Sequence, residues 1–291
     1  MVKVSLFFNG VRGLKVFNYL TKKNNIQIQN IFLAKKFLDR EICKDLKKRK
    51  IKFKLINMLQ LHEYLRLDKH DNDLNIFCGF PYIVKNNCYN LTKYGSINLH
   101  AGKLPKYRGG SPLNWQIING EKKIYISTIK MSKGIDTGKI IKEYSFKLYD
   151  KDTIKTVHEK CNKIFPKITY QSIQKIIDRK KLKKQSYKTK YFKQRSFKDG
   201  KINWKKNNST QIYNFVRAIT YPYHCAYTFF DKKIYFIPKC EKIEKKYNLD
   251  NSGDFIGTDN SIIVKTKNKY IKFYNANLYK KIKKLKVYKF D

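Results

Sequence analysis

Short apolar runs rich in β-branched and aromatic residues alternate with amphipathic segments in the first third of the chain. Such runs are typical of buried strands, and they occupy residues 2–8, 26–34, 74–80 and 96–100. Between them, residues 9–23 turn through Gly10 and Gly13 into a predicted helix with Leu14, Phe17 and Leu20 on one face, and a second helix is predicted at about 37–49. Because strands that alternate with helices form parallel sheets, the pattern predicts an α/β fold with a Rossmann-like, mostly parallel, doubly wound sheet.

Ligands of such a sheet bind beyond the carboxyl ends of its strands. Three of the predicted strands are followed there by segments that contain glycine or polar residues, namely residues 9–13, 79–83 and 98–110. We therefore expect these three segments to converge on one crevice.

The middle of the chain continues the α/β pattern. A helix is predicted over residues 111–120, opened by Ser111 with Pro112 at its first position. A long amphipathic helix is predicted over about 152–180, in which Pro166 implies a kink or a break. Two strands joined by a loop are predicted between these helices, over residues 123–131 and 138–148.

The last part of the chain has a different pattern. After a basic, polar linker at about 181–200 comes one predicted helix, residues 209–219. Short, evenly spaced strand-like runs follow, which are typical of a small β domain such as a barrel or an OB-like fold. We therefore predict a main domain over residues 1–190 and a smaller β-rich domain over residues 191–291. The expected strands are residues 225–230, 233–237, 261–266 and 269–276.

The composition permits a real core, since 42% of the residues are hydrophobic, but the formal net charge is +43. Such a charge can indicate a nucleic acid or another polyanion as the partner. It can also come from lysines that only solvate the surface. The basic residues are spread along the whole chain instead of forming one local patch, which favours the second interpretation. We therefore expect no nucleic-acid partner, although a positive field can still attract anionic substrates.

The cysteine pattern points to a reducing environment. The six cysteines form no Cys-x-x-Cys pair and have no metal-like spacing with the five histidines. We therefore expect no metal site, reduced and mostly buried thiols, and a cytoplasmic location. The apolar run near the first residue is too short for a signal peptide, and no segment approaches the 18 apolar residues that indicate a membrane span.

Three polar residues are candidates for chemistry. Asn98 and His100 are two positions apart on a predicted strand, so their side chains share one face. Asn can donate to a developing oxyanion, and His can exchange a proton near neutral pH. Asp136 lies between Gly134 and Gly138 in a predicted loop, where it could orient His100 or hold a water. A structural strand end and an ordinary hairpin turn are the alternative interpretations.

The order and spacing of the motifs around these residues resemble the signature of the folate-dependent formyltransferases. That signature has an Asn-x-His strand end, a Leu-Pro-x-Tyr/Trp-Arg-Gly loop, an Asn-Gly-Glu helix end and a Met-x-x-x-x-Asp-x-Gly loop. The matching residues are Asn98, His100, Leu104, Pro105, Tyr107, Arg108, Gly109, Asn119, Gly120, Glu121, Met131, Asp136 and Gly138. The resemblance implies the formyltransferase fold, with Asn98, His100 and Asp136 as catalytic residues. It leaves open whether His100 or Asp136 is the base.

Within this family, three features are similar to enzymes that act on nucleotide-linked amino sugars. These are the Asn114-Trp115 pair, the Asn-Gly-x-Arg-Gly segment at 9–13, and residues 197–230 with their Asp-Gly-x-Ile-x-Trp and Val-Arg-Ala motifs. Two departures from the pattern are Gly102-Lys103, where many relatives have Ser-Leu, and His224-Cys225 in place of Pro-Gly.

The resemblance also implies the reaction and its substrates. The formyl donor is N10-formyltetrahydrofolate, and the acceptor is the amine of a nucleotide-linked amino-dideoxysugar, with a 4-amino group preferred over a 3-amino group. The product belongs to surface polysaccharide biosynthesis, such as lipopolysaccharide O-antigen. The nucleotide and the sugar epimer stay open.

The resemblance further assigns binding residues. Phe80, Tyr82, Ile83 and Gly138 are candidates for the folate pocket; the first three can also be plain core residues. Candidates for the acceptor pocket are Arg12, Tyr107, Arg108, Asn114 and Trp115. Arg108 has an alternative role, in which it locks its loop by bonding carbonyl groups.

Two other functions compete with the sugar enzyme. The first is a methionyl-tRNA formyltransferase, which the net charge supports because a tRNA acceptor needs phosphate contacts. The second is an inactive, basic nucleic-acid-binding protein, against which the intact set of Asn98, His100 and Asp136 argues. We also expect a homodimer, because the β-rich C-terminal domain offers open strand edges.

Overall fold

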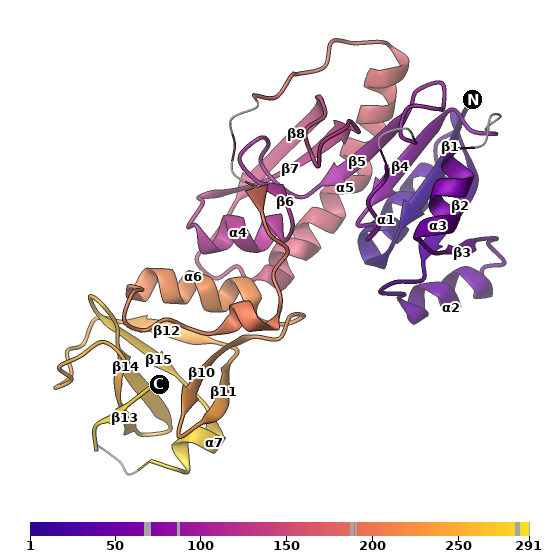
Figure 1. Ribbon diagram of the computed structural model, residues 1–291. Helices are drawn as coiled ribbons and strands as arrows, with labels where there is room; N and C mark the ends of the chain where they lie inside the picture. The colour runs from indigo at the N-terminus through magenta and orange to yellow at the C-terminus, as the bar shows by residue number, and fades with distance from the viewer. Residues whose placement is uncertain (67–70, 86–87, 187–188, 190, 283–285, 291) are drawn as a thin grey trace. The chain divides into compact units, whose positions relative to one another are not determined.

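The computed structural model describes residues 1–66, 71–85, 88–186, 189, 191–282 and 286–290 (Figure 1). The chain divides into two compact units, each assembled from three segments. The first unit comprises Met1–Gly109, Tyr125–Phe146 and Glu159–Phe192. The second comprises Gly110–Ile124, Lys147–His158 and Lys193–Asp291.

A seven-stranded sheet with the strand order β3-β2-β1-β4-β5-β7-β8 is the centre of the fold (Figure 1). The five strands from β3 to β5 pair in parallel, and β7 pairs with β5 in the antiparallel direction. The α/β fold with a mostly parallel sheet is thereby confirmed. The strands are β1 (Val2–Phe8), β2 (Ile26–Ala34), β3 (Lys54–Ile56), β4 (Leu74–Cys78), β5 (Ser96–His100), β7 (Lys123–Lys130) and β8 (Ile140–Lys147).

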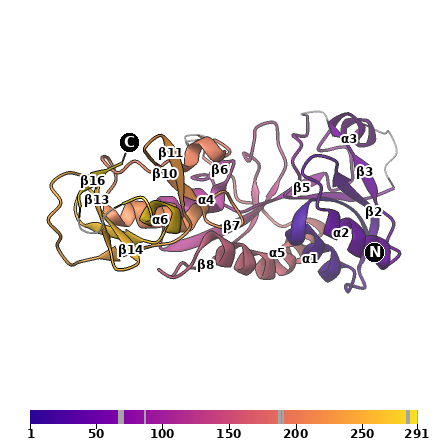
Figure 2. The ribbon, with the colours of Figure 1, turned by 90° about the horizontal axis from the view of Figure 1, so that it is seen from below.

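Helices cover both faces of this sheet, with α3 on one face and α1 and α5 on the other (Figure 2). On the α3 face, Leu61 and Leu65 pack with Phe7, Phe32 and Phe77 in one buried cluster. This cluster lies directly beneath the candidate site, because Phe80, Tyr82 and Val84 pack against it. The helices are α1 (Gly10–Leu20), α2 (Arg40–Lys48), α3 (Met58–Leu65) and α5 (Ile154–Ile177).

Two helices differ from their predictions. The expected start of α2 near residue 37 was wrong, because the Asp39 carboxylate accepts hydrogen bonds from the backbone N–H groups of Glu41 and Ile42 and so caps the helix. The alternative of a break at Pro166 was also wrong, since α5 runs on both sides of it. Burial of residues such as Val157 and Phe165 offsets the proline penalty of about 3 kcal/mol.

The second unit contains the predicted C-terminal β-rich region, which is confirmed as antiparallel. A five-stranded sheet has the order β12-β15-β14-β13-β16, and β10 and β11 form a separate hairpin. The predicted strands correspond to β10, β11, β14 and β15, whereas β12, β13 and β16 were not predicted. The strands are β10 (Ala226–Phe230), β11 (Lys233–Ile237), β12 (Cys240–Ile243), β13 (Asp254–Thr258), β14 (Ser261–Lys265), β15 (Tyr270–Phe273) and β16 (Tyr288–Lys289).

The two predicted helices of the second unit are present, with one difference in the capping, whereas the short helix α7 (Ala276–Tyr279) was not predicted. The predicted helix over 209–219 is α6 (Ser209–Ile219). Ser111 precedes α4 (Pro112–Ile118), but its expected capping bond was wrong, because its φ of 50° turns it left-handed and its side chain makes no cap hydrogen bond. Its hydroxyl instead accepts a hydrogen bond from the backbone N–H of Arg195.

The remaining elements are short. In the second unit they are η1 (Phe197–Gly200) and α7 (Ala276–Tyr279), and in the first unit β6 (Arg108–Gly109) pairs with β9 (Tyr191–Phe192).

Two further expectations concern the whole chain. The six cysteines all lie in the described part of the chain and form no disulfide bonds there, and four of them are buried. Among the described residues, none of the helices combines the length and the apolar character needed to cross a bilayer.

Candidate active site

The three candidate catalytic side chains meet in the first unit. Asn98 and His100 lie on β5, and Asp136 reaches them from the loop between β7 and β8. The Asn98 Nδ2 donates to Oδ1 of Asp136 at 3.3 Å, and Nδ1 of His100 lies 3.3 Å from Oδ2 of Asp136. Both the His100 and the Asp136 side chains are more than nine-tenths buried. The loop at Asp136 is therefore more than a hairpin turn, because its carboxylate joins both strand-end residues.

A backbone carbonyl fixes the other edge of the His100 ring. Nε2 of His100 lies 2.6 Å from the carbonyl oxygen of Tyr107, which can only accept a hydrogen bond. Nε2 therefore carries a proton, and proton exchange at this ring takes place at Nδ1, which faces Asp136. Nδ1 faces Oδ2 of Asp136, so a proton that reaches this edge of the ring meets a nitrogen and an oxygen that can both accept it.

The backbone of the Asp136 loop is tightly constrained. Asp136 has a left-handed φ of 54°, and its Oδ2 accepts a hydrogen bond from the Gly109 N–H at 3.0 Å. A Cβ atom on Gly138 would lie 1.6 Å from the carbonyl oxygen of Lys130, so only glycine fits there. Ser132 and Thr137 share a hydrogen bond of 2.8 Å across the loop. These constraints fix the direction in which the Asp136 carboxylate points.

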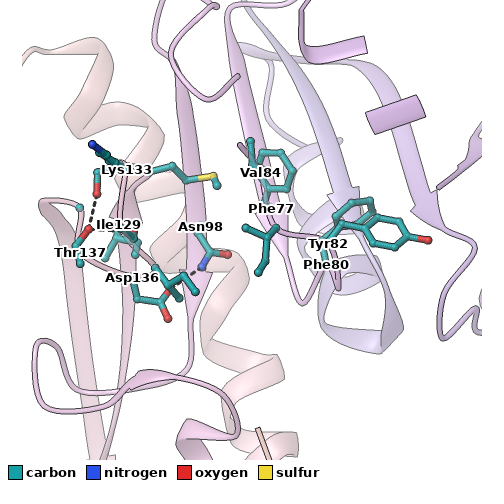
Figure 3. A pocket seen from close by; sticks show the side chains of 15 residues that line it. Phe77, Phe80, Tyr82, Val84, Asn98, Ile129, Lys133, Asp136 and Thr137 are labelled. Carbon is teal, nitrogen blue, oxygen red and sulfur yellow. Dashed lines mark hydrogen bonds between the residues drawn. The ribbon is translucent and has the colours of Figure 1, made fainter. Parts of the chain in front are cut away.

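A cavity of about 150 Å³ opens beside Asn98 and Asp136 (Figure 3). Phe77, Phe80 and Val84 line one side, and Asn98, Ile129 and Asp136 line the other, so an apolar wall faces a polar one (Figure 3). The predicted folate residues Phe80, Tyr82, Ile83 and Gly138 all line this cavity. Of the three segments expected to converge, 79–83 and 98–110 contribute lining residues. Within the described residues, the lining includes none from 9–13.

A buried histidine supports the apolar wall from behind. Nε2 of His62, on α3, accepts a hydrogen bond from the Lys85 N–H at 3.3 Å and lies 3.2 Å from the carbonyl oxygen of Ile83. Burial lowers the pKa of His62 from 6.5, and the positive charges of Lys85 and Arg66 act in the same direction. The neutral ring therefore holds the segment that follows Ile83 through the N–H of Lys85.

Two of the residues predicted to line the acceptor pocket, Arg12 and Tyr107, contact other side chains of the first unit. Nε of Arg12 donates to Oδ1 of Asn162 at 3.1 Å, and its guanidinium lies 4.8 Å above the ring of Phe165. Tyr107 is fully buried, and its ring stacks on that of Phe192 at 5.2 Å. Contacts of these two residues with an acceptor stay predictions.

The contacts of Arg108 are those expected of its alternative role, in which it locks its loop. Its Nη2 donates to the carbonyl oxygen of Ser186 at 3.0 Å, and Nε and Nη2 both donate to the side chain of Gln185. The guanidinium is buried. The side-chain amide of Gln185 connects it to the Asp136 loop. A direct contact of Arg108 with the acceptor also stays a prediction.

Asn114 and Trp115 belong to the second unit. Asn114 is buried, and its Nδ2 donates to the carbonyl oxygen of Ala218 on α6 at 2.7 Å. The Trp115 indole N–H donates to the carbonyl oxygen of Lys193, and the Arg195 guanidinium lies 4.8 Å from its ring. Their assignment to an acceptor pocket stays a prediction.

Sequence reasoning missed two kinds of site residue. Ile129 and Met131 line the cavity from β7 and its end, and an antiparallel partner of β5 could have pointed to them. Gln185, whose amide binds the Asp136 loop, lies in the segment interpreted as a linker. No local pattern distinguishes it from the polar residues around it.

The chain matches two family models, and together they span both units. The model described as formyl transferase matches residues 47–173, and the model described as formyl transferase, C-terminal domain, matches residues 196–290.

Curated relatives and solved structures agree with this match. The bifunctional polymyxin resistance protein ArnA of Wigglesworthia glossinidia brevipalpis is 35% identical over 240 residues, which are 76% of this chain and 34% of the relative. A methionyl-tRNA formyltransferase of Thermodesulfovibrio yellowstonii is 35% identical over 182 residues, 62% of this chain and 58% of the relative. The chain thus spans less than two thirds of either relative.

A solved structure shares the fold along nearly the whole chain. The N-formyltransferase of Helicobacter canadensis, in complex with folinic acid and dTDP-3-aminofucose, has a TM-score of 0.71 at 22% identity. The match covers 94% of this chain and 99% of that protein. With both family models matched in order and the Asn-x-His strand end facing the aspartate loop, the chain belongs to the formyltransferase family.

Proposed function

We propose that this protein is an N-formyltransferase that moves the formyl group of N10-formyltetrahydrofolate to the amine of a nucleotide-linked amino sugar. The single observation that carries the proposal is the contact of Asn98 and His100 with one carboxylate, Asp136, at the edge of a half-apolar cavity. The family match and the folinic acid bound by the Helicobacter canadensis relative support the donor.

The cavity suits the donor chemically. A flat heterocycle fits against the apolar side formed by Phe77, Phe80 and Val84, and backbone groups of the 132–138 loop offer hydrogen bonds on the polar side. N10-formyltetrahydrofolate supplies an activated formyl group when it is bound. Side chains of this protein stabilise the developing charge and move the proton.

Asn98 can stabilise the negative charge that develops on the formyl oxygen. Its Nδ2 carries two hydrogens, and only one of them faces Asp136. The other is available to an oxyanion, which is the role that preorganised amides have in acyl transfer. Asp136 holds this amide in place before the substrates arrive.

The His100–Asp136 pair can move the proton. The acceptor amine must be neutral to attack the formyl carbon, and it loses a proton as the new C–N bond forms. Since Nε2 of His100 is held by the Tyr107 carbonyl, the pair takes this proton on the side of Nδ1 and Oδ2. The proton then passes to the departing nitrogen of the donor as its bond to the formyl carbon breaks, so that the pair returns to its starting protonation state.

An amino sugar is the acceptor favoured by the features of the sequence. The Asn114-Trp115 pair and the segment around Arg217 are similar to sugar enzymes. The Helicobacter canadensis relative with dTDP-3-aminofucose supports this acceptor class, although at 22% identity its likeness concerns the fold. The position of the amine, 4 or 3, and the nucleotide are questions for the experiment below.

A tRNA acceptor is the second candidate, and one surface feature favours it. A groove at the carboxyl end of α5 is lined by eight residues, of which seven are basic, and such a surface suits a phosphate backbone. The methionyl-tRNA formyltransferase of Thermodesulfovibrio yellowstonii is also among the relatives. The basic residues are Lys139, Lys175, Arg179, Lys180, Lys181, Lys183 and Lys184.

An acceptor panel tests the proposal. The purified protein is incubated with N10-formyltetrahydrofolate and, separately, with charged initiator tRNA and with dTDP-, GDP- and UDP-linked 3-amino and 4-amino sugars. Release of tetrahydrofolate is followed, with His100→Asn as the blank. Turnover on one sugar and not on tRNA supports the proposal and identifies the nucleotide. Turnover on tRNA alone overturns it.

A further inference from the structure

One buried amide joins the Asp136 loop to the arginine that follows Tyr107. Nε2 of Gln185 donates to the carbonyl oxygen of Asp136 at 2.9 Å and to that of Gly138 at 2.5 Å. Its Oε1 accepts hydrogen bonds from Nε and Nη2 of Arg108 at 3.1 and 2.9 Å. The amide thus uses its donor and its acceptor at the same time to tie two segments together.

Gln185 is itself held firmly. Its exposed fraction is 9% and that of Arg108 is 7%, so water does not compete well for these bonds. Two residues earlier, Lys183 exchanges a pair of backbone hydrogen bonds with Ile140 at the start of β8, at 2.8 and 3.1 Å. Arg108 also donates to the carbonyl oxygen of the next residue, Ser186. Gln185 is therefore anchored on both sides.

The bonds from Gln185 act on a backbone that needs support. Asp136 adopts a left-handed φ of 54°, which a residue with a Cβ atom enters only at a cost. Gln185 binds the carbonyl of Asp136 itself and that of Gly138, so it fixes the peptide plane that follows Asp136 and the plane that follows Gly138. The direction of the Asp136 carboxylate follows from that backbone.

We propose that Gln185 is a positioning residue that, together with Arg108, sets the Asp136 carboxylate against His100 and Asn98. Its effect on catalysis rests on the proposed function, whereas its effect on the His100 ring does not. The side-chain hydrogen bonds of Gln185 go to Arg108, Asp136 and Gly138, so it acts on His100 and Asn98 through the backbone of Asp136.

Nitrogen NMR of the histidine rings tests the proposal without any substrate. The full-length protein is labelled with ¹⁵N-histidine, and the signals of His100 are assigned by their loss in His100→Asn. Gln185→Ala should shift the His100 ring signals at fixed pH, because the carboxylate beside Nδ1 moves. Gln174→Ala is the matched control, since the Nε2 of Gln174 is buried and has no hydrogen-bond partner in the described part of the chain. Unchanged His100 signals in a folded Gln185→Ala protein overturn the proposal.

Gln185→Glu separates the two halves of the contact. Glutamate keeps an oxygen for Arg108 but replaces the donor that faces the Asp136 and Gly138 carbonyls with a second oxygen. The His100 signals should shift in Gln185→Glu at least as much as in Gln185→Ala. If Gln185→Glu behaves like the unchanged protein, the bonds to the two carbonyls have no positioning role and the proposal fails.

Kinetics on an acceptor identified by the panel gives a second, independent readout. Displacement of a catalytic group by about 1 Å can cost about 100-fold in rate, so kcat of Gln185→Ala should fall about tenfold to 100-fold. In an Asp136→Asn background the same substitution should cost less than about threefold, because it acts through Asp136. Equal losses in both backgrounds indicate a merely structural role and overturn the proposal. If no acceptor turns over, the proposed function fails, and the NMR result still decides the role of Gln185.

Discussion

Nδ1 of His100 and Oδ2 of Asp136 lie 3.3 Å apart, and both side chains are shielded from water. The opposite ring nitrogen of His100 is held by a backbone carbonyl at 2.6 Å, so the ring cannot turn its basic side elsewhere. The pair therefore offers one defined direction for proton exchange. The neighbouring amide of Asn98 shares the same carboxylate and is aligned with it.

Asp136→Asn should lower kcat by about 100-fold to 10,000-fold, the range of general acid–base catalysis. The neutral amide removes the negative charge beside His100 and loses one acceptor for Asn98, while the size of the side chain is preserved. Steady-state kinetics with the identified acceptor measures the effect. Asp45→Asn, at an exposed carboxylate paired with Arg49, is the control and should keep full activity. A kcat within threefold of the unchanged protein would contradict the role of Asp136.

Gly138→Ala should abolish turnover without unfolding the protein. The new Cβ would lie 1.6 Å from the Lys130 carbonyl oxygen, so the Asp136 loop must move. Gly134→Ala is a graded control in the same loop and should lose less activity, since its Cβ would meet the Thr137 side chain, with Oγ1 at 2.7 Å, which can rotate with the loss of its hydrogen bond to Ser132. Activity assays together with circular dichroism distinguish a displaced loop from a lost fold. Equal activity of the two variants would show that the loop tolerates the displacement.

The sheet and the shared face of Asn98 and His100 could be predicted from the sequence, because both depend on local patterns of residues. A strand places Asn98 and His100 on one face by its two-residue period alone. The approach of Asp136 was expected from the resemblance and its spacing. In the structure it depends on a left-handed residue and on a glycine that has no room for a side chain.

The parts that could not be predicted depend on distant partners. Gln185 bonds to atoms 47 and 49 residues earlier in the chain, and nothing in its lysine-rich surroundings marks it. The short elements β3 and α3 were missed, since a three-residue strand has no readable period and the capping box of Asn57 and Gln60 lies outside a clear apolar pattern. The sequence was consistent with two roles for Arg108, binding the acceptor and locking its loop. Only its observed contacts favour one of these roles over the other.

His62 should make the first unit less stable at acidic pH. Folding lowers its pKa below 6.5, so the unfolded chain takes up a proton first as the pH falls. The contribution of His62 to stability is therefore complete above pH 6.5 and is lost as the pH falls through the lower folded pKa. Thermal melting followed by circular dichroism between pH 7.5 and pH 5 measures the change, and we expect Tm to fall over this range.

Variants identify the group responsible for that pH dependence. His62→Gln should flatten the dependence of Tm on pH, because glutamine can still accept from the Lys85 N–H but does not titrate. His224→Gln, at an exposed ring in the second unit, should leave the dependence as it was. A His62→Gln protein with an unchanged pH dependence would exclude His62 as its cause.

Arg217→Met should destabilise the second unit by at least about 2 kcal/mol. The buried Arg217 guanidinium donates to Oδ1 of Asn214 and to the carbonyl oxygens of Tyr149, Asp150 and Asp152. Methionine removes the guanidinium donor from each of these four acceptors, and hydrogen bonds to a charged group contribute about 1.5–3 kcal/mol.

Urea unfolding followed by tryptophan fluorescence reports the Arg217→Met effect selectively, because both tryptophans, Trp115 and Trp204, belong to the second unit. Arg217→Lys keeps the charge but not the planar set of donors, so it should recover only part of the loss. Lys269→Met, also in the second unit, removes a lysine whose side chain is 50% exposed and pairs with Glu244, and it should change the free energy of unfolding by less than about 1 kcal/mol. A loss at Arg217 no larger than that at Lys269 would show that the 149–152 segment is held by other contacts.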